Sequence, residues 1–222
     1  MYLLLTARKG ISSLQLSKEI SVSQKSSWFL LHRLREACGA DMEALSGVVE
    51  IDECYVGGLE ENKHKSKRAN AGHGGVTKTI VLGMRERGGR TKAKPIKATD
   101  QFTLYREIFM HVKKGSTVYT DEHGGYNGLR FNYDHKTVSH KAGEYHKPDG
   151  TGTNRIESVW AVLKRGLHGV YHHASEKHLA RYINEFTFRL NAGNCKQHTL
   201  LRLNALVDAC AGKRITYKDL TA

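Results

Sequence analysis

The sequence predicts a mixed α/β fold: a five-stranded sheet with flanking helices, preceded by a small helical arm. β-branched residues alternate over 47–58 and again over 77–100, which is typical of strands. From residue 101 onward, helical and strand-like segments take turns, which favours helices packed on a mixed sheet. A length of 222 residues is enough for one large domain and a smaller one.

The elements of the sheet domain follow from residue type and periodicity. Strand composition predicts five strands, at 47–58, 77–89, 91–100, 116–121 and 135–140. Helical periodicity predicts three helices, over 101–113, shortly after Asp121, and over 153–167. The last helix has the clearest pattern, because its apolar residues recur at helical spacing and must face the sheet. These residues are Ile156, Val159, Trp160, Leu163 and Leu167.

The helical arm has the outline of a helix-turn-helix. Over residues 10–37 a short helix, a polar turn and a longer helix follow one another. We expect an inward-facing apolar set, consisting of Leu14, Leu16, Ile20, Trp28, Leu31 and Leu34. The outward-facing set is expected to be Gln24, Lys25, Ser27, His32 and Arg33. Of these, Gln24, Lys25, Ser27 and Arg33 are candidate DNA contacts, because the start of a recognition helix meets base edges. A plain helical hairpin that caps the next domain is the alternative.

The charge balance points to a polyanionic partner. The chain carries 35 Lys and Arg against 22 Asp and Glu, a formal net charge of +13. With 39% hydrophobic and 26% charged residues, the composition excludes a disordered or collagen-like chain. No apolar stretch is long enough to cross a membrane, and the apolar start is too short for a signal peptide. We therefore expect a soluble intracellular protein that binds a polyanion, such as double-stranded DNA, and no membrane.

Cysteine and histidine spacing argues against a zinc site. The four cysteines form no C-x-x-C pair, so we expect reduced and mostly packed thiols; they are Cys38, Cys54, Cys195 and Cys210. A run of histidines also matches no compact zinc site, and surface positions are expected for its members. They are His168, His172, His173 and His178.

A basic loop follows the first strand. It carries Lys63, Lys65, Lys67 and Arg68 within a few positions and has almost nothing apolar to bury. We expect these side chains to bind DNA phosphates. A solvated run of surface charge is the alternative interpretation.

Three acidic residues are the candidate catalytic set. Asp52 lies in the middle of the first strand, with Val49 and Ile51 as apolar neighbours. Asp121 ends the fourth strand, and Glu157 stands in the first turn of the last helix, beside its apolar stripe. Carboxylates brought together in this way repel one another unless divalent cations are bound. Oxygen ligands suit Mg²⁺ or Mn²⁺, so we infer a centre for phosphoryl transfer with two ions held by Asp52, Asp121 and Glu157.

Basic residues on the same helix are candidate DNA contacts. Asp121 and Glu157 are separated by 35 residues, and Lys164 follows Glu157 by two helical turns, within about 20° and about 10.5 Å along the same face. Lys164, Arg165 and Asn154 are therefore expected to hold the DNA strand beside the carboxylates. Alternatively, Glu157 and Lys164 are surface residues of an ordinary amphipathic helix.

These segments together resemble the DDE transposases of bacterial insertion sequences, in particular the IS1595 group. The resemblance is carried by GISSLQLSKEISVSQKSSWFLLHRLREA, VVEIDECYVGG, VYTDEHGGYNGL and the segment from HKPDGTGTNRIESVW to FTFRLN, which span most of residues 10–191. It implies an RNase H-like, retroviral-integrase-like catalytic domain with Asp52, Asp121 and Glu157 as its triad, and Lys164 as the basic partner on the helix. It further implies Mg²⁺ or Mn²⁺ as cofactor, the element's terminal inverted repeats and target DNA as substrates, and a homo-oligomer on DNA in a bacterial cytoplasm.

The expected domains are a helix-turn-helix arm at 1–45, a catalytic domain at 46–191 and a helical tail at 192–222. Proteins of this group normally begin with a zinc ribbon, which resembles a module that recognises element ends. This chain starts just before the helix-turn-helix, and the missing ribbon argues against autonomous transposition. The expected function is metal-dependent strand cleavage and strand transfer at element ends. A nuclease or resolvase of the same fold that cuts without joining is one alternative, and an inactive truncated DNA-binding remnant is another.

Overall fold

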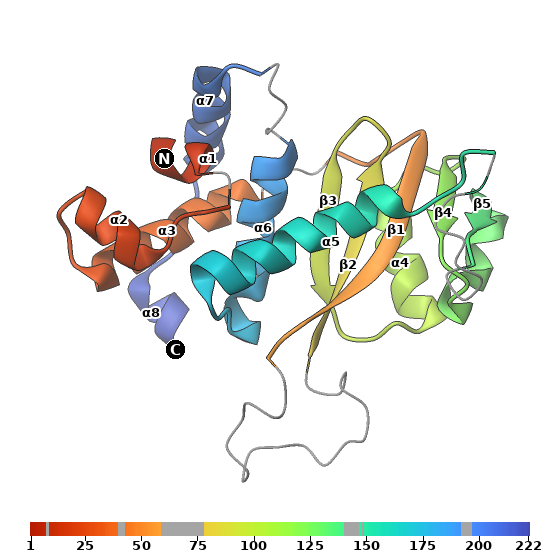
Figure 1. Ribbon diagram of the computed structural model, residues 1–222, viewed down its shortest axis with the longest axis horizontal. Coiled ribbons are helices and arrows are strands. Elements are labelled where there is room, and N and C mark those ends of the chain that lie inside the picture. Colours follow the sequence, from red (N-terminus) through yellow and green to blue (C-terminus); the bar gives the residue numbers. More distant parts are fainter. Residues whose placement is uncertain (8, 40–42, 59–77, 140–146, 148, 192–196) are drawn as a thin grey trace, which may run out of the picture. The chain divides into compact units, whose positions relative to one another are not determined.

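The computed structural model describes residues 1–7, 9–39, 43–58, 78–139, 147, 149–191 and 197–222 (Figure 1). The chain divides into two compact units. One comprises Glu43–Ala161, and the other combines Met1–Met42 with Val162–Ala222. The boundary thus falls inside the last helix of the sheet unit, and residues 162–222 group with the N-terminal helices. The domain limits expected at residues 45 and 191 stay a prediction.

The first unit is built on a five-stranded sheet of order β3-β2-β1-β4-β5. Its strands are β1 (Val48–Val56), β2 (Thr79–Glu86), β3 (Thr91–Ile96), β4 (Thr117–Thr120) and β5 (Asp134–Thr137). The first three form an antiparallel meander, whereas β4 pairs parallel to β1 and β5 parallel to β4. This mixed sheet with flanking helices confirms the predicted RNase H-like α/β class.

Different elements pack on the two faces of the sheet. One face carries the main apolar core, to which α4 (Gln101–His111) and the 3₁₀ helix η3 (Gly124–Phe131) contribute. Helix α5 (Asn154–Gly166) packs in front of the opposite face in the view of Figure 1. Because successive residues of a strand alternate between faces, Ile51 enters the core while Asp52 faces α5.

The predicted elements differ from the observed ones mainly at their ends. The short helix after Asp121 is the 3₁₀ helix η3, whose start is capped by the His123 side chain, which accepts from the amide of Gly125. The last strand covers Asp134–Thr137 rather than residues 135–140. All five members of the predicted apolar stripe of α5 are buried, as its periodicity required.

The second unit is helical. Its elements are α1 (Tyr2–Thr6), α2 (Ser13–Glu19), α3 (Gln24–Cys38), a π-helical turn η5 (Leu167–Tyr171), α6 (Glu176–Asn191), α7 (Thr199–Cys210) and α8 (Tyr217–Thr221). The hydroxyls of Ser12 and Ser23 cap α2 and α3 by accepting from backbone amides three residues on. The core joins Leu4 of α1, Leu31 of α3 and Leu206 of α7, so residues from both ends of the chain build it.

Two outward-facing assignments on α3 are wrong. Ser27 and His32 are both fully buried. Ser27 lies one turn before the core residue Leu31, and His32 is enclosed by the rings of Trp28, His178 and Tyr182. The inward-facing stripe of α3 is therefore wider than its apolar residues indicate. Conversely, two residues expected inside are exposed: Leu14 at 53% and Ile20 at 39%.

The described cysteines are free thiols. Cys38 and Cys54 are buried and Cys210 is partly so, while Cys195 lies outside the described residues. Burial raises the pKa of Cys38 to about 12, so this thiol stays protonated and packs as an apolar group. Among the described residues, none of the helices is long and apolar enough to traverse a bilayer.

Candidate active site

Asp52 occupies the centre of β1 and is half-buried beneath α5. Its Oδ2 accepts a 2.9 Å hydrogen bond from the indole Nε1 of Trp160. The pKa of Asp52 is raised to about 6, mainly by burial and to a smaller extent by the negative charges of Asp121 and Glu157, while the Trp160 hydrogen bond opposes the shift. The structure thus brings the three predicted acids close enough for two of them to act electrostatically on the third.

Asp121 stands directly after β4, where the chain turns into η3. Its Oδ1 accepts from the backbone amide of His123 at 3.0 Å, a turn that Asp commonly makes with its own following residues. The buried hydroxyl of Thr120 donates to the Asp121 carbonyl at 2.7 Å. Because β4 pairs parallel to β1, Asp121 emerges at the sheet beside the second half of β1.

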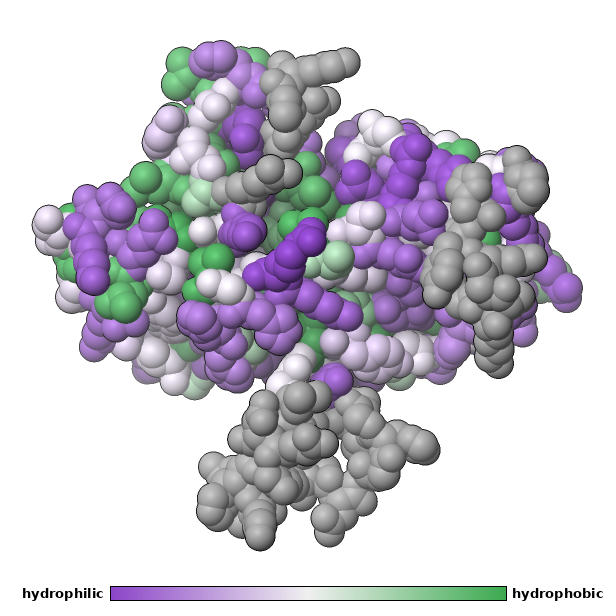
Figure 2. All heavy atoms as spheres, in the orientation of Figure 1, coloured by the Kyte–Doolittle hydropathy of each residue, from purple (hydrophilic) through white to green (hydrophobic). Residues whose placement is uncertain are grey.

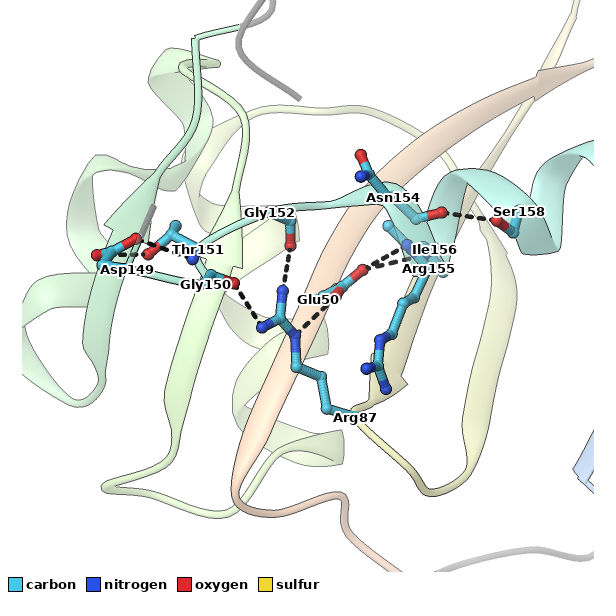
Figure 3. A network of polar contacts seen from close by, with 10 residues as sticks. All are labelled: Glu50, Arg87, Asp149, Gly150, Thr151, Gly152, Asn154, Arg155, Ile156 and Ser158. Atoms are coloured by element: carbon cyan, nitrogen blue, oxygen red, sulfur yellow. Dashed lines mark hydrogen bonds and ion pairs between the residues drawn. The ribbon is translucent and has the colours of Figure 1, made fainter. Parts of the chain in front are cut away.

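Glu157 lies in the first turn of α5, between two points at which this helix is attached to β1. At the first point, Oε2 of Glu50 accepts the amides of Arg155 at 2.9 Å and Ile156 at 3.1 Å (Figure 3). At the second, Trp160 donates to Asp52. Glu157 follows the first attachment by one residue and precedes the second by three. Both attachments therefore fix the position of Glu157 relative to β1.

A glycine on β2 allows α5 to approach the sheet. Gly83 pairs with Asp52 in the register of β1 and β2. A Cβ at Gly83 would stand 2.4 Å from the ring of Trp160 and 3.0 Å from Ile156. The missing side chain therefore makes room for the indole that hydrogen-bonds Asp52.

Sequence reasoning missed a fourth acid, Glu53. It neighbours Asp52 on β1 but, by strand alternation, belongs to the opposite face. Burial raises the pKa of Glu53 to about 7; the Tyr126 hydroxyl opposes this shift, and the charges of Asp52 and Asp121 add to it. An acidic residue at a core-facing position of an apolar strand was the available indication. Sequence reasoning also missed Glu50 and Arg87, because their partners are known only from the fold.

The donor set has the chemistry of a divalent-cation site, since carboxylate oxygens are what Mg²⁺ and Mn²⁺ prefer. The raised pKa of Asp52 comes mainly from burial, with smaller contributions from the charges of Asp121 and Glu157, and a bound divalent cation would stabilise the ionised carboxylate. In the described part of the chain, however, no group of three or more His, Cys, Asp or Glu side chains could hold a metal ion as it stands. Metal binding by Asp52, Asp121 and Glu157 stays a prediction.

The candidate DNA-binding residues fall into three groups. On α5, Asn154, Lys164 and Arg165 are exposed, and hydrophilic side chains line this side of the helix (Figure 2). On α3, the exposed candidates are Gln24, Lys25 and Arg33, whereas the burial of Ser27 removes it from any contact with bases in this conformation. The ammonium of Lys25 stands 4.6 Å from the ring centre of Tyr217. The loop candidates Lys63, Lys65, Lys67 and Arg68 lie outside the described residues.

The model of the ISXO2-like transposase domain, a DDE transposase family of the IS1595 group, matches residues 44–191. The chain belongs to this family. The matched range contains all five strands and α5, and with them Asp52, Asp121 and Glu157.

One relative of this ISXO2-like chain is a protein of a transposable element. A protein in the transposable element ISH50 of Halobacterium salinarum is 30% identical over 193 residues, covering 82% of this chain and 65% of that protein. Two solved structures are more distant, each 11% identical. One is in a simian T-cell lymphotropic virus intasome with PP2A regulatory subunit B56 gamma, with a TM-score of 0.40, covering 97% of this chain and 74% of that one. The other is in a pre-cleavage Mos1 transpososome, with a TM-score of 0.30, covering 96% and 78%.

Proposed function

We propose that this chain is an insertion-sequence transposase that cuts DNA at the ends of its element and joins those ends to target DNA, with divalent cations as cofactor. The observation that carries the proposal is the electrostatic coupling of Asp52 to Asp121 and Glu157 inside an ISXO2-like domain. These acids come from β1, from the end of β4 and from α5, so the fold itself gathers them. The matched relative in the element ISH50 supports the same biological context.

In the proposed mechanism, Asp52, Asp121 and Glu157 hold two Mg²⁺ or Mn²⁺ ions. When bound, these ions would activate the attacking oxygen and stabilise the leaving oxygen of an in-line displacement. The side chains themselves position the ions and the DNA. Cleavage frees a 3′-hydroxyl of the element, which then attacks a target phosphodiester; one P–O bond forms as another breaks, so no energy source is needed.

DNA binding in this proposal rests on charge. The formal net charge of +13 supplies affinity that does not depend on sequence. Lys164 and Arg165 are exposed on the helix that carries Glu157 and are assigned to the phosphates. Gln24, Lys25 and Arg33 on α3 are assigned to the recognition of the terminal repeats, and assembly of several copies on paired ends is expected.

The test uses purified protein and DNA that carries the inverted repeats flanking the gene. Strand cleavage and joining are expected with Mg²⁺ or Mn²⁺ and not in EDTA. Asp52→Asn, Asp121→Asn and Glu157→Gln each remove a ligand charge with little change in volume and are expected to abolish both reactions while the protein stays folded. The control is Asp134→Asn, an exposed acid on β5 that accepts from Thr117.

The outcomes separate the alternatives. Cleavage without joining would favour the nuclease or resolvase. Specific binding without cleavage in any divalent cation would favour the DNA-binding remnant. Full activity in EDTA, or in any of the three variants, would contradict the mechanism.

A further inference from the structure

Arg87, immediately after β2, contacts three separate parts of the chain with one guanidinium (Figure 3). Its Nε donates to Oε1 of Glu50 at 2.9 Å. One Nη donates to the carbonyl of Gly150 at 2.5 Å and the other to that of Gly152 at 3.1 Å. The guanidinium also lies 4.7 Å from the ring centre of Tyr119 on β4. A planar fork of donors can serve all these partners at once, which a lysine cannot do.

Glu50 is fully buried, and both of its oxygens have partners. Oε1 accepts from Arg87, while Oε2 accepts the amides of Arg155 and Ile156. Those amides belong to the first turn of α5, where helix donors have no partner within the helix. Glu50 thus caps α5 from a different element, and its negative charge also suits the positive end of the helix dipole.

The contacts on β1, on β4 and at the start of α5 each lie within two residues of a candidate catalytic acid. Glu50 precedes Asp52 by two residues and shares its face of β1. Tyr119 precedes Asp121 by two residues on β4. Ile156 is followed directly by Glu157. The Glu50–Arg87 clasp, as we call this pair, therefore joins the three segments that carry the acids.

We propose that the Glu50–Arg87 clasp is a positioning device that sets the spacing of Asp52, Asp121 and Glu157 and so determines how well they bind divalent cations. The inference rests on the proposed function, because it concerns the same three acids. Neither Glu50 nor Arg87 is assigned contact with DNA or metal. They act by fixing the start of α5, the segment before it and β4 to one another.

The test compares Arg87→Lys with Arg90→Lys. Lysine keeps the charge that compensates buried Glu50 but cannot also reach both glycine carbonyls. Arg90 is the matched control: it belongs to the same hairpin and pairs with Glu43 at 2.7 Å, away from the clasp. Its side chain is 30% exposed, against 23% for Arg87. Glu50→Gln, which keeps the volume and one acceptor oxygen, is the second variant should Arg87→Lys fold poorly.

Three quantities are measured on each folded protein: Mn²⁺ affinity by calorimetry without DNA, amide hydrogen exchange at Arg155 and Ile156, and the melting temperature. In Arg87→Lys, Mn²⁺ affinity is expected to fall about tenfold, the typical effect of losing a group that orients metal ligands, and both amides should exchange faster. Arg90→Lys should match the wild type in affinity and exchange.

A lower melting temperature with wild-type Mn²⁺ affinity in both clasp variants would make the clasp merely structural and overturn the inference. Unchanged exchange at the α5 amides would overturn it too. Failure of the proposed function is distinguishable, because it would already show in the wild-type protein as a lack of Mn²⁺ binding and of strand cleavage.

Discussion

Trp160 and Asp52 are joined by a 2.9 Å hydrogen bond from the indole Nε1 to Oδ2, across 108 positions of sequence. The tryptophan is a buried member of the apolar stripe of α5, yet its polar tip reaches a candidate catalytic carboxylate. One side chain therefore packs the helix on the sheet and also orients Asp52. A substitution that keeps the aromatic ring but removes the indole N–H can therefore test the hydrogen bond separately from the packing.

Trp160→Phe should lower the strand-cleavage rate about tenfold, because Asp52 loses the donor that orients it, as for other groups that hold metal ligands in place. The aromatic ring is retained, so most of the packing survives. The measurements are the cleavage rate with Mn²⁺ and thermal unfolding. The matched control is Trp28→Phe, on α3 in the other unit; a rate equal to the wild type in Trp160→Phe would contradict a role for the hydrogen bond.

Gly83→Ala should destabilise the protein by about 1 to 3 kcal/mol, the usual cost of overpacking. The added Cβ would stand 2.4 Å from Trp160, and the indole must then move away from Asp52. Urea unfolding measures the loss. Gly124→Ala is the comparison, since the contact nearest to a Cβ there is a flexible side chain 4.0 Å away. Equal stability of the two variants would show that α5 accommodates the methyl group.

Glu185→Gln should cost about 3 kcal/mol or more, because Glu185 neutralises a buried cluster between α3 and α6. Its Oε2 accepts from Arg35 at 2.6 Å, while Oε1 accepts from Tyr171 at 2.6 Å and Arg189 at 2.7 Å. An exposed pair provides the control: Glu36 is 43% exposed and accepts from Arg181 across the same two helices. Glu36→Gln should cost less than about 1 kcal/mol. Similar unfolding free energies for both variants would contradict the difference between buried and exposed pairs.

Because His32 is buried in its neutral form, it should make the folded protein less stable as the pH falls from 7.5 to 5. Its pKa is lowered from 6.5 to about 3, mainly by burial and in addition by the positive charges of Arg35, His178 and Arg181. In the unfolded chain the His32 side chain is therefore protonated below about pH 6.5, whereas in the folded protein it stays neutral down to about pH 3. His32 alone should reduce the unfolding free energy by about 2 kcal/mol at pH 5 relative to pH 7.5.

The measurement for His32 is urea unfolding between pH 7.5 and pH 5, in the wild type and in His32→Gln. Asp52 and Glu53 act in the opposite direction, because their folded pKa values, about 6 and about 7, are raised. Only the difference between the two proteins isolates the histidine. His173→Gln, at an exposed histidine, serves as control. Identical pH profiles for the wild type and His32→Gln would show that position 32 does not titrate as inferred.

Lys164→Ala should reduce the slope of log affinity against log salt by about one unit, equally on element-end DNA and on scrambled DNA. An exposed lysine that binds one phosphate carries no sequence information. Gln24→Ala, on the first turn of α3, should instead reduce the preference for element ends and leave the slope unchanged. A salt titration of both variants decides this; an unchanged slope in Lys164→Ala would make it a solvated surface residue.

Local sequence patterns were sufficient to predict the strands, most of the helices and the mixed α/β class. Alternation of β-branched residues marks β1 and β2, and the spacing of apolar residues marks α5 with all its buried positions. These are local patterns, set by the two-residue repeat of a strand and the 3.6-residue repeat of a helix. The identity of Asp52, Asp121 and Glu157 as the candidate set came from local position and family resemblance together.

Contacts between distant segments, which local patterns do not encode, fixed the remaining features. The burial of His32 depends on the rings of Trp28, His178 and Tyr182, and two of these belong to α6, so the sequence of α3 does not encode it. The roles of Glu50, Arg87 and Trp160 depend on which strand meets which helix. A buried charge or indole is stable only where partners from distant segments satisfy it, so its position in the sequence gives no sign of the contact until the chain is folded.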